Sequence, residues 1–311
     1  MWDFILQCVD RLSGYATGKF LPAVVIFVVI ALAVFLVFLL QPKTVGFFGL
    51  SKESEEAVRL QECLESKGYT VYYAENLEDL KSIDCNAWIV QTTSDLFAEK
   101  ILQILGDKAI FIGNRPSLPQ PIRYVGMDMK EAGTLFAKLL ADLPNAGDTN
   151  EDGTLSCLLL TAPEGHKEKQ DFLQGLEEGM ETFHLPHTIL DVLACPRTVE
   201  AGYAATLDSL STYGRDIEVI LVSSEAQAAG AAQAIHQSGW AVSKDFYLLS
   251  TGCSMDSMKA LNEWQRSGLV FASQEDLDDL VLTAVADTIR GKTQKEYLPP
   301  FKLYQNTTFL Q

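Results

Sequence analysis

Short apolar runs typical of β-strands alternate with amphipathic runs typical of helices from Lys43 onward, and no other feature limits the fold as strongly. The run 54–68, for example, has apolar residues at helical spacing and ends in glycine. Strands that alternate with helices predict parallel sheets flanked by helices, which is an α/β fold. The expected strands are 44–50, 69–74, 87–92, 109–114, 122–127, 155–161, 187–193, 217–223 and 246–251.

An apolar segment precedes this alternating part. Residues Phe20 to Leu40 include no charged side chain, and as a helix they would extend about 31 Å, about the thickness of a bilayer core. The segment is longer than the apolar region of a signal peptide, and no A-x-A cleavage pattern follows it. We therefore expect an uncleaved, single-pass transmembrane helix at 20–40, after a short segment at 1–19. The few Lys and Arg residues beside it do not decide its orientation.

The charge of the chain argues against one class of partner. Acidic residues outnumber basic residues by 41 to 24, and the formal net charge is −17. This charge repels a phosphate backbone, so we expect no nucleic-acid binding. The six cysteines include no CxxC pair, which argues against a zinc or redox motif. We interpret them as small buried residues, and the sequence leaves open whether two of them form a disulfide.

Motifs for catalysis are missing as well. The sequence contains no G-x-S-x-G, P-loop or dinucleotide fingerprint. His166 and Glu168 have the spacing that opens a zinc deaminase signature, but its P-C-x-x-C partner is absent. We therefore do not expect an enzyme.

The polar stretch GDTNEDGTLS, residues 147–156, has the pattern of the first half of a calcium loop. Oxygen-bearing side chains occupy alternate positions at Asp148, Asn150 and Asp152, and a glycine that allows a sharp turn follows. The twelfth position of an EF-hand loop supplies a carboxylate, but here that position is Leu159. A polar turn without a metal is the alternative interpretation.

The missing carboxylate has to come from another part of the chain. Glu218 is the candidate, because it opens an otherwise apolar strand that we expect in the same sheet. In this interpretation the backbone carbonyl of Thr154 also faces the ion, as the seventh loop position does in an EF-hand. The expected cofactor is a structural calcium ion.

Several longer stretches resemble the type I periplasmic binding proteins, and among them the galactose/glucose-binding proteins. The resemblance extends from about Lys43 to Leu310 and is most specific in RYVGMDMKEAGTLFAKLLA, DTNEDGTLSCLLLTAPEGHKEKQDFLQGLEEGM, IEVILVSSEAQAAGAAQAI and MDSMKALNEWQRSG. It implies two α/β lobes with a ligand cleft between them, and three crossings of the chain near 125–128, 272–276 and 294–299. The implied first lobe is 44–126 plus 275–296, and the implied second lobe is 127–273 plus 297–311.

The resemblance also implies a calcium site, formed by a nine-residue loop and a distant glutamate that begins a strand. Carried over to this chain, its ligands are Asp148, Asn150, Asp152, Thr154, Ser156 and Glu218. One ligand departs from the family, because Ser156 stands where the family has a glutamine with a longer reach.

The ligand-binding positions of the family carry over in the same way. They fall on Asn114, His166, Glu168, Ser224, Ser254 and Gln274. Elsewhere the chain departs from the family, with Phe172 in place of an arginine and Pro196 in place of a stacking tryptophan. Without the resemblance, Asn114 and His166 are typical turn or loop residues, and Glu168 is a first-turn glutamate that favours the helix dipole.

These features predict a membrane-anchored, extracytoplasmic solute-binding protein of the cell membrane. Residues 1–19 would be cytoplasmic, because members of the family work outside the cytoplasmic membrane. The expected ligand is a monosaccharide similar to galactose or glucose, and the expected partner is an ABC transporter permease or a membrane sensor. The alternative is an interaction or sensory module whose sugar site has degenerated and which keeps a structural calcium site.

Overall fold

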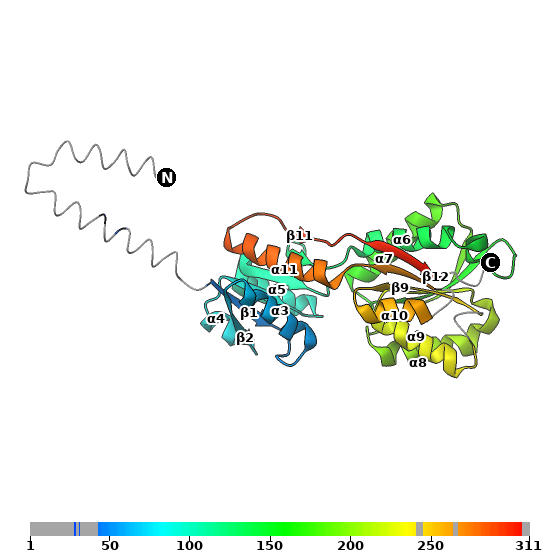
Figure 1. Ribbon diagram of the computed structural model, residues 1–311, viewed down its shortest axis with the longest axis horizontal. Helices are drawn as coiled ribbons and strands as arrows, with labels where there is room; N and C mark the ends of the chain where they lie inside the picture. Colours follow the sequence, from blue (N-terminus) through cyan, green and yellow to red (C-terminus); the bar gives the residue numbers. More distant parts are fainter. Residues whose placement is uncertain (1–27, 29–30, 32–42, 241–244, 264–266, 307–311) are drawn as a thin grey trace, which may run out of the picture.

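The computed structural model describes residues 43–240, 245–263 and 267–306, together with Val28 and Ala31. The expected anchor at 20–40 lies outside the described residues except for these two positions. Within the described residues, no helix combines the length and the apolar character needed to cross a bilayer. Figure 1 shows the described chain as two α/β lobes side by side, joined by a few extended segments.

The first lobe contains a six-stranded parallel sheet in the order β11-β5-β4-β3-β1-β2. Its strands are β1 (Lys43–Phe48), β2 (Tyr69–Ala74), β3 (Ala87–Val90), β4 (Ala109–Ile112), β5 (Arg123–Val125) and β11 (Glu296–Tyr297). The helices of this lobe are α3 (Glu55–Ser66), α4 (Leu77–Ser82), α5 (Asp95–Leu105) and α11 (Gln274–Ile289), with a 3₁₀ turn η1 (Gly106–Lys108).

The second lobe contains another six-stranded sheet, in the order β12-β10-β9-β8-β6-β7. Its strands are β6 (Leu155–Thr161), β7 (His187–Ala194), β8 (Val219–Val222), β9 (Tyr247–Gly252), β10 (Ser267–Phe271) and β12 (Lys302–Asn306). The helices are α6 (Met129–Ala141), α7 (Lys167–Thr182), α8 (Val199–Tyr213), α9 (Glu225–Gln237) and α10 (Met255–Glu263), with 3₁₀ turns η2 (Pro144–Gly147) and η3 (Gly214–Asp216). β12 pairs with β10 in the antiparallel direction, and the other pairs are parallel.

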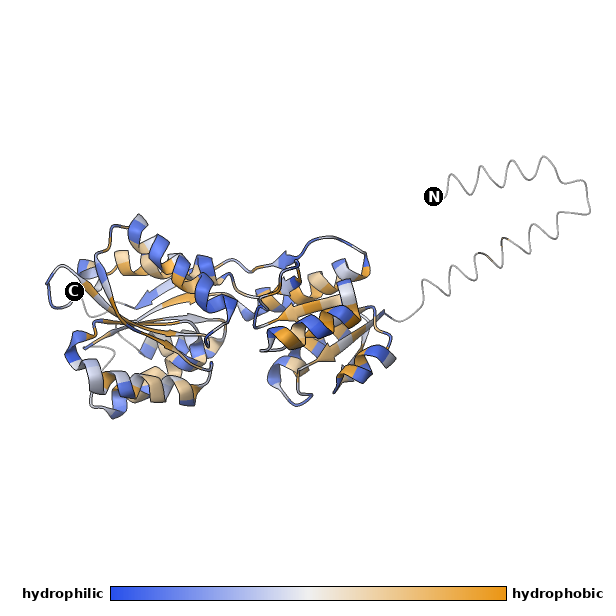
Figure 2. Ribbon diagram, turned by 180° about the vertical axis from the view of Figure 1, so that it is seen from behind, coloured by the Kyte–Doolittle hydropathy of each residue, from blue (hydrophilic) through white to orange (hydrophobic). Residues whose placement is uncertain are grey.

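The central strands are apolar throughout because helices cover both faces of each sheet. Every residue of β3, β4 and β8 is buried. β2 lies at the edge of its sheet and alternates between half-buried and exposed residues. Figure 2 shows the same arrangement, with apolar strands inside and hydrophilic residues on the outer helix faces.

Polar residues determine where the helices next to the lobe boundary begin. The Ser54 side chain accepts the N–H of Ala57 at the start of α3, and Ser224 does the same for Gln227 in α9. These bonds satisfy N–H groups that have no partner within the helix. These caps fix the first turns of α3 and α9, which follow β1 and β8 along the chain.

The described chain has the predicted two-lobed α/β fold. All nine expected strands are present, with bounds that differ by a few residues from those predicted. β12, which was not among the expected strands, pairs antiparallel with β10. The chain passes between the lobes after β5, after β10 and after β11. The five cysteines among the described residues are free, so no disulfide joins them.

Candidate functional site

A cavity of about 230 Å³ lies between the lobes, at the carboxyl ends of strands from both sheets. Gly113 follows β4, Gly126 follows β5 and Ser223 follows β8, and all three line the cavity. Ligands of open α/β sheets bind at this edge, because the loops that follow parallel strands meet there. The volume is small compared with the roughly 300–1,000 Å³ of pockets for drug-sized ligands.

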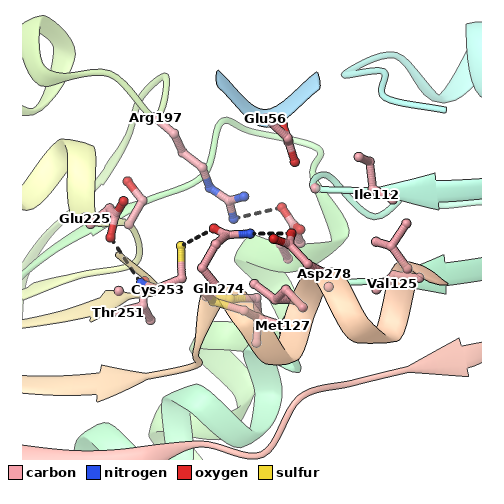
Figure 3. Close-up of a pocket in the computed structure, with 18 of the residues that line it drawn as sticks. Glu56, Ile112, Val125, Met127, Arg197, Glu225, Thr251, Cys253, Gln274 and Asp278 are labelled. Carbon is pink, nitrogen blue, oxygen red and sulfur yellow. Dashed lines mark hydrogen bonds and ion pairs between the residues drawn. The ribbon is translucent and has the colours of Figure 1, made fainter. Parts of the chain in front are cut away.

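Apolar and polar residues together line the cavity. The apolar residues of the lining are mainly aliphatic and include Leu60, Ile112, Val125, Met127, Leu277 and Val281. The polar residues of the lining are Glu56, Glu168, Arg197, Ser223, Ser224, Glu225, Thr251, Cys253, Gln274 and Asp278. Figure 3 shows many of these side chains around the cavity. Within the described residues, Tyr124 is the one aromatic side chain in the lining.

Glu168, in the first turn of α7, connects the two lobes. Its carboxylate is buried, with 4% of the side chain exposed, and its Oε2 lies 2.8 Å from Nη2 of Arg197 in an ion pair. Its Oε1 accepts the backbone N–H of Arg115 from the first lobe at 3.2 Å, and Oη of Tyr124 lies 3.5 Å away. Burial, followed by the charge of Glu168, raises the pKa of the Tyr124 phenol, which therefore stays protonated.

A second polar group lies at the start of α11. Oδ2 of Asp278 is 2.7 Å from Nε of Arg59, and Oδ1 accepts a hydrogen bond of 3.1 Å from Gln274. The Cys253 thiol donates to Oε1 of Gln274 at 3.4 Å. Burial, followed by the charge of Glu225, raises the pKa of this thiol to about 12, so it is a neutral donor at physiological pH.

Glu225, in the first turn of α9, holds the turn that follows β9. Its Oε2 accepts the backbone N–H groups of Cys253 and Ser254 at 3.1 and 3.3 Å. The same oxygen accepts the hydroxyl groups of Ser254 and Ser257 at 3.1 and 2.7 Å. Because all four donors bond to Oε2, Oε1 of Glu225 has no hydrogen bond within the described residues.

Four buried polar atoms of the lining have no hydrogen-bond partner. They are Oε2 of Glu168, Nε and Nη2 of Arg197, and Oγ of Ser223. The Glu168–Arg197 contact is an ion pair without hydrogen-bond alignment. Because buried polar atoms are normally hydrogen-bonded, this cluster indicates a site where a polar ligand would supply the missing partners.

The structure brings only some of the expected ligand-binding residues to the cavity. Glu168, Ser224 and Gln274 line it. Asn114, His166 and Ser254 do not belong to the lining: Asn114 accepts a 3.5 Å bond from Arg197, and Ser254 is bonded to Glu225. His166 is the residue before α7, and its side chain does not cap the helix.

Sequence reasoning missed Glu56, Arg197, Glu225 and Asp278. Glu56 and Glu225 each lie in the first turn of the helix that follows a buried strand. The rule that sites gather at the carboxyl ends of parallel strands points to both positions. Arg197 and Asp278 carry no such local signal, because only the packed lobes bring them together.

The residues expected to bind calcium meet at the loop 148–156. The carboxylate of Glu218 is 1% exposed. Its Oε1 accepts the backbone N–H groups of Thr149 and Asn150 at 2.6 and 3.0 Å, and its Oε2 accepts that of Ser156 at 2.9 Å. The distant glutamate thus lies beside the loop, with its oxygens bonded to the backbone.

The other side chains of the loop are also bonded to the backbone. The two oxygens of Asp148 accept the N–H groups of Glu151 and Gly153 at 2.7 and 2.9 Å. Oδ1 of Asn150 and Oδ1 of Asp152 each accept the N–H group two residues later. Oxygen donors are the kind that calcium prefers, but no group of three or more His, Cys, Asp or Glu in the described chain is arranged to hold a metal ion. As arranged here, these side-chain oxygens accept backbone N–H groups of the loop.

Comparison with known proteins identifies one family. The sequence profile described as "Periplasmic binding protein domain" matches residues 76–293. No curated protein sequence matches this chain.

Solved structures with the same fold include several sugar-binding proteins. A galactofuranose binding protein is 18% identical, with 86% of this chain and 96% of that chain covered and a TM-score of 0.71. The binding protein of the arabinose ABC transporter from Shewanella sp. ANA-3, bound to L-arabinofuranose, is 17% identical, with 86% and 93% covered and a TM-score of 0.69. A glucose-galactose binding protein from Geobacillus stearothermophilus is 13% identical, with 87% and 100% covered and a TM-score of 0.66. At these identities the similarity shows the fold and does not single out a ligand.

Proposed function

This chain belongs to the periplasmic binding protein family, and from that premise we propose that the cavity between its lobes binds a monosaccharide. The observation that carries the proposal is the cluster of buried polar atoms without a hydrogen bond on Glu168, Arg197 and Ser223, of which Glu168 Oε2 and Arg197 Nη2 meet only as an ion pair. A buried polar atom without a partner costs about 1–3 kcal/mol, and a ligand that supplies the bond recovers that cost. Sugar hydroxyls both donate and accept, so one kind of group can satisfy the carboxylate, the guanidinium and the hydroxyl.

The mixed lining of the site supports a small ligand with both apolar and polar groups. The aliphatic side chains of Leu60, Ile112 and Val281 provide contact for C–H groups, and the polar residues of the lining provide hydrogen-bond partners. Structural neighbours whose names specify galactofuranose, arabinofuranose and glucose or galactose support a sugar as the ligand class.

We also propose that the protein is anchored in the cell membrane, with both lobes on the extracytoplasmic side. The support is the uncharged segment 20–40 of the sequence and the family to which residues 76–293 belong. An anchored receptor of this kind would deliver its ligand to an ABC transporter or a membrane sensor. The proposal that the loop 148–156 binds calcium rests on its sequence pattern and on Glu218, which lies beside the loop and whose Oε2 accepts a single N–H group within the described residues.

Isothermal titration calorimetry of the full-length chain against pentoses and hexoses tests the proposed function. The protein is kept in a detergent without a sugar headgroup, so that the detergent does not compete. We expect at least one sugar to bind, and Ser223→Ala to weaken that binding by about twofold to tenfold through loss of one hydrogen bond.

The matched control is Ser211→Ala, which removes a hydroxyl from the exposed face of α8 and leaves the cavity unchanged. Because Ser223 Oγ has no partner in the protein, its removal leaves no protein group unsatisfied. A protein that melts cooperatively and binds none of the sugars contradicts the proposal. That result favours the alternative of an interaction module with a degenerate sugar site.

A further inference from the structure

The lining of the cavity carries an excess of negative charge. Four carboxylates belong to it, and Arg197 is the one cationic side chain among the described lining residues. Arg197 pairs with Glu168, and Asp278 pairs with Arg59 from outside the lining. Glu56 and Glu225 therefore have no cationic partner in the part of the chain that the structure describes. The excess negative charge therefore lies inside the proposed ligand site.

Each of these two carboxylates has one oxygen without a hydrogen bond to any residue that the structure describes. The single bond to Glu56 comes from Gln91 and reaches Oε2 at 3.0 Å. All four donors to Glu225 reach its Oε2. In both residues Oε1 has no hydrogen bond within the described residues. Figure 3 shows both side chains beside the cavity, Glu56 on the first lobe and Glu225 on the second.

A further polar group points to a ligand independently of the charge. Ser223 is 4% exposed, lines the cavity directly before the Ser224–Glu225 helix start, and its Oγ has no partner. Buried hydroxyls are normally hydrogen-bonded, so an unpartnered one that lines a cavity points to a polar ligand. This hydroxyl and Glu225, which has no cationic partner within the described residues, both line the same cavity.

The small number of aromatic rings adds a constraint. Tyr124 is the one aromatic residue among the described residues of the lining, and the other apolar residues there are mainly aliphatic. A quaternary ammonium ligand, which is recognised by a cage of several aromatic rings, does not suit this lining. A primary ammonium group suits the two carboxylates, because a charged donor to a carboxylate forms a bond about twice as strong as a neutral one.

From these observations we infer that the ligand is an amino sugar, a monosaccharide-sized polyol with a protonated primary amine. The inference rests on the proposed function, because it assigns a ligand class to the same cavity. The ammonium group lies against the free oxygen of Glu225 or Glu56, and the hydroxyls bond to Arg197, Glu168 and Ser223. Sugar acids and sugar phosphates are repelled by the same carboxylates.

Titration calorimetry with matched ligands tests this inference on the full-length chain. The probes are galactosamine, galactose, N-acetylgalactosamine and galacturonic acid, together with the corresponding glucose series. They are compared in a mildly acidic buffer in which the amine is protonated and the carboxylates are ionised. We expect the amino sugar of one series to bind about tenfold to a hundredfold more tightly than its neutral parent, because it gains a charge-assisted bond. The acid should bind more weakly than the parent.

The outcomes distinguish failure of the amino-sugar inference from failure of the proposed sugar-binding function. If a neutral sugar or a sugar acid binds as tightly as the amino sugar, the inference is overturned while the sugar-binding function stands. If no probe binds to a cooperatively folded protein, the sugar-binding function itself fails.

Variants then locate the amine. Glu225→Gln keeps an acceptor for the turn at 253–257, and Glu56→Gln keeps the bond from Gln91, so both preserve the local hydrogen bonds. We expect one of them to reduce the ratio of amino-sugar affinity to neutral-sugar affinity toward one. Glu99→Gln on the exposed surface of α5 is the matched control and should leave the ratio unchanged. If the ratio of amino-sugar to neutral-sugar affinity is unchanged in both Glu225→Gln and Glu56→Gln, the assignment of the amine to these carboxylates is contradicted.

Discussion

The carboxylate of Glu218 stabilises the loop 148–156 by accepting several hydrogen bonds from it. It is buried at the entrance to β8 and accepts three backbone N–H groups and the Thr149 hydroxyl. A carboxylate offers about four acceptor positions and no donor, which matches a site lined by N–H groups. The same residue is the strongest candidate ligand for calcium, so its substitution bears on both interpretations.

We predict that Glu218→Gln strongly destabilises the second lobe. Its amide group places N–H donors where the carboxylate accepted, and each buried backbone donor left unpaired costs about 1–3 kcal/mol. Thermal unfolding should show a decrease of roughly 5–10 °C in melting temperature. Asp152→Asn, in the exposed part of the loop, should change it little in a metal-free buffer.

The same melts, repeated with calcium and with a chelator, test the calcium proposal. Calcium binding predicts a higher melting temperature in calcium for the wild type, and loss of this difference in Asp152→Asn. Equal melting temperatures in the two buffers contradict calcium binding and leave Glu218 as a metal-free stabiliser of the loop.

Cys253 gives a prediction about pH. Burial raises its pKa to about 12, whereas an unfolded thiol titrates near roughly 8.5. Because the folded pKa is the higher one, the contribution of this group to stability is complete below about pH 8.5 and is lost as the pH rises toward 12. Alkylation followed by peptide mass spectrometry should find Cys253 labelled more slowly than Cys63 at about pH 8. Equal labelling rates contradict the strongly raised pKa of the half-buried Cys253 thiol.

Residue-level signals show why the site was only partly predictable. Glu53, Glu55 and Glu56 stand almost together in LSKESEE, and nothing local distinguishes them. The helical spacing of α3 distinguishes Glu56, because this residue lies one turn before the buried Leu60, on the helix face that lines the cavity. Ser224 and Gln274 were predictable by resemblance, but the ion pair between Glu168 and Arg197 depends on the packing of the first turn of α7 against the loop after β7 and could not be inferred from spacing.

At the scale of elements, α6 and α7 pack unusually closely. A Cβ atom at Gly175 would overlap the carbonyl oxygen of Lys130, and one at Gly133 would overlap that of Phe172. Close packing places Phe136 and Phe172 ring to ring, with centroids 5.2 Å apart. The contact holds α7, and with it Glu168 at its first turn, against the second lobe.

We predict that Gly175→Ala destabilises the protein by about 2–4 kcal/mol, because the methyl group forces two helix backbones apart. Urea unfolding monitored by circular dichroism measures the change. Glu181→Ala, on the exposed face of the same helix, should remain within about 0.5 kcal/mol of the wild type. Similar effects of the two substitutions would show that the helices tolerate the added methyl group.

Strands that a local sequence pattern marks were predicted, whereas strands that form only by pairing with a distant part of the chain were not. The nine expected strands are apolar runs between turn signals, which is a local property. β10 was missed because SGLVF is short and contains a glycine. β11 has two residues, and β12 pairs antiparallel with β10 across a chain separation that contains all of α11. No local signal encodes such a pairing.

At the scale of the whole molecule, the two lobes face each other across one polar cavity. The three segments that connect them are short, and Glu168 of the second lobe is bonded to the backbone of Arg115 in the first. A ligand in the cavity contacts both lobes at once, so binding and the relative position of the lobes are coupled. We therefore predict that a bound ligand stabilises the cavity-lining segments of both lobes together.

Hydrogen–deuterium exchange of the full-length protein, with and without a mixture of pentoses, hexoses and amino sugars, tests this central claim most directly. We predict slower exchange in peptides from both walls, 112–127 and 274–281 of the first and 223–225 and 251–253 of the second, with no change in α8 outside the cavity. Unchanged exchange on both walls, or protection confined to a surface away from the cavity, would contradict a ligand-binding cleft between the lobes.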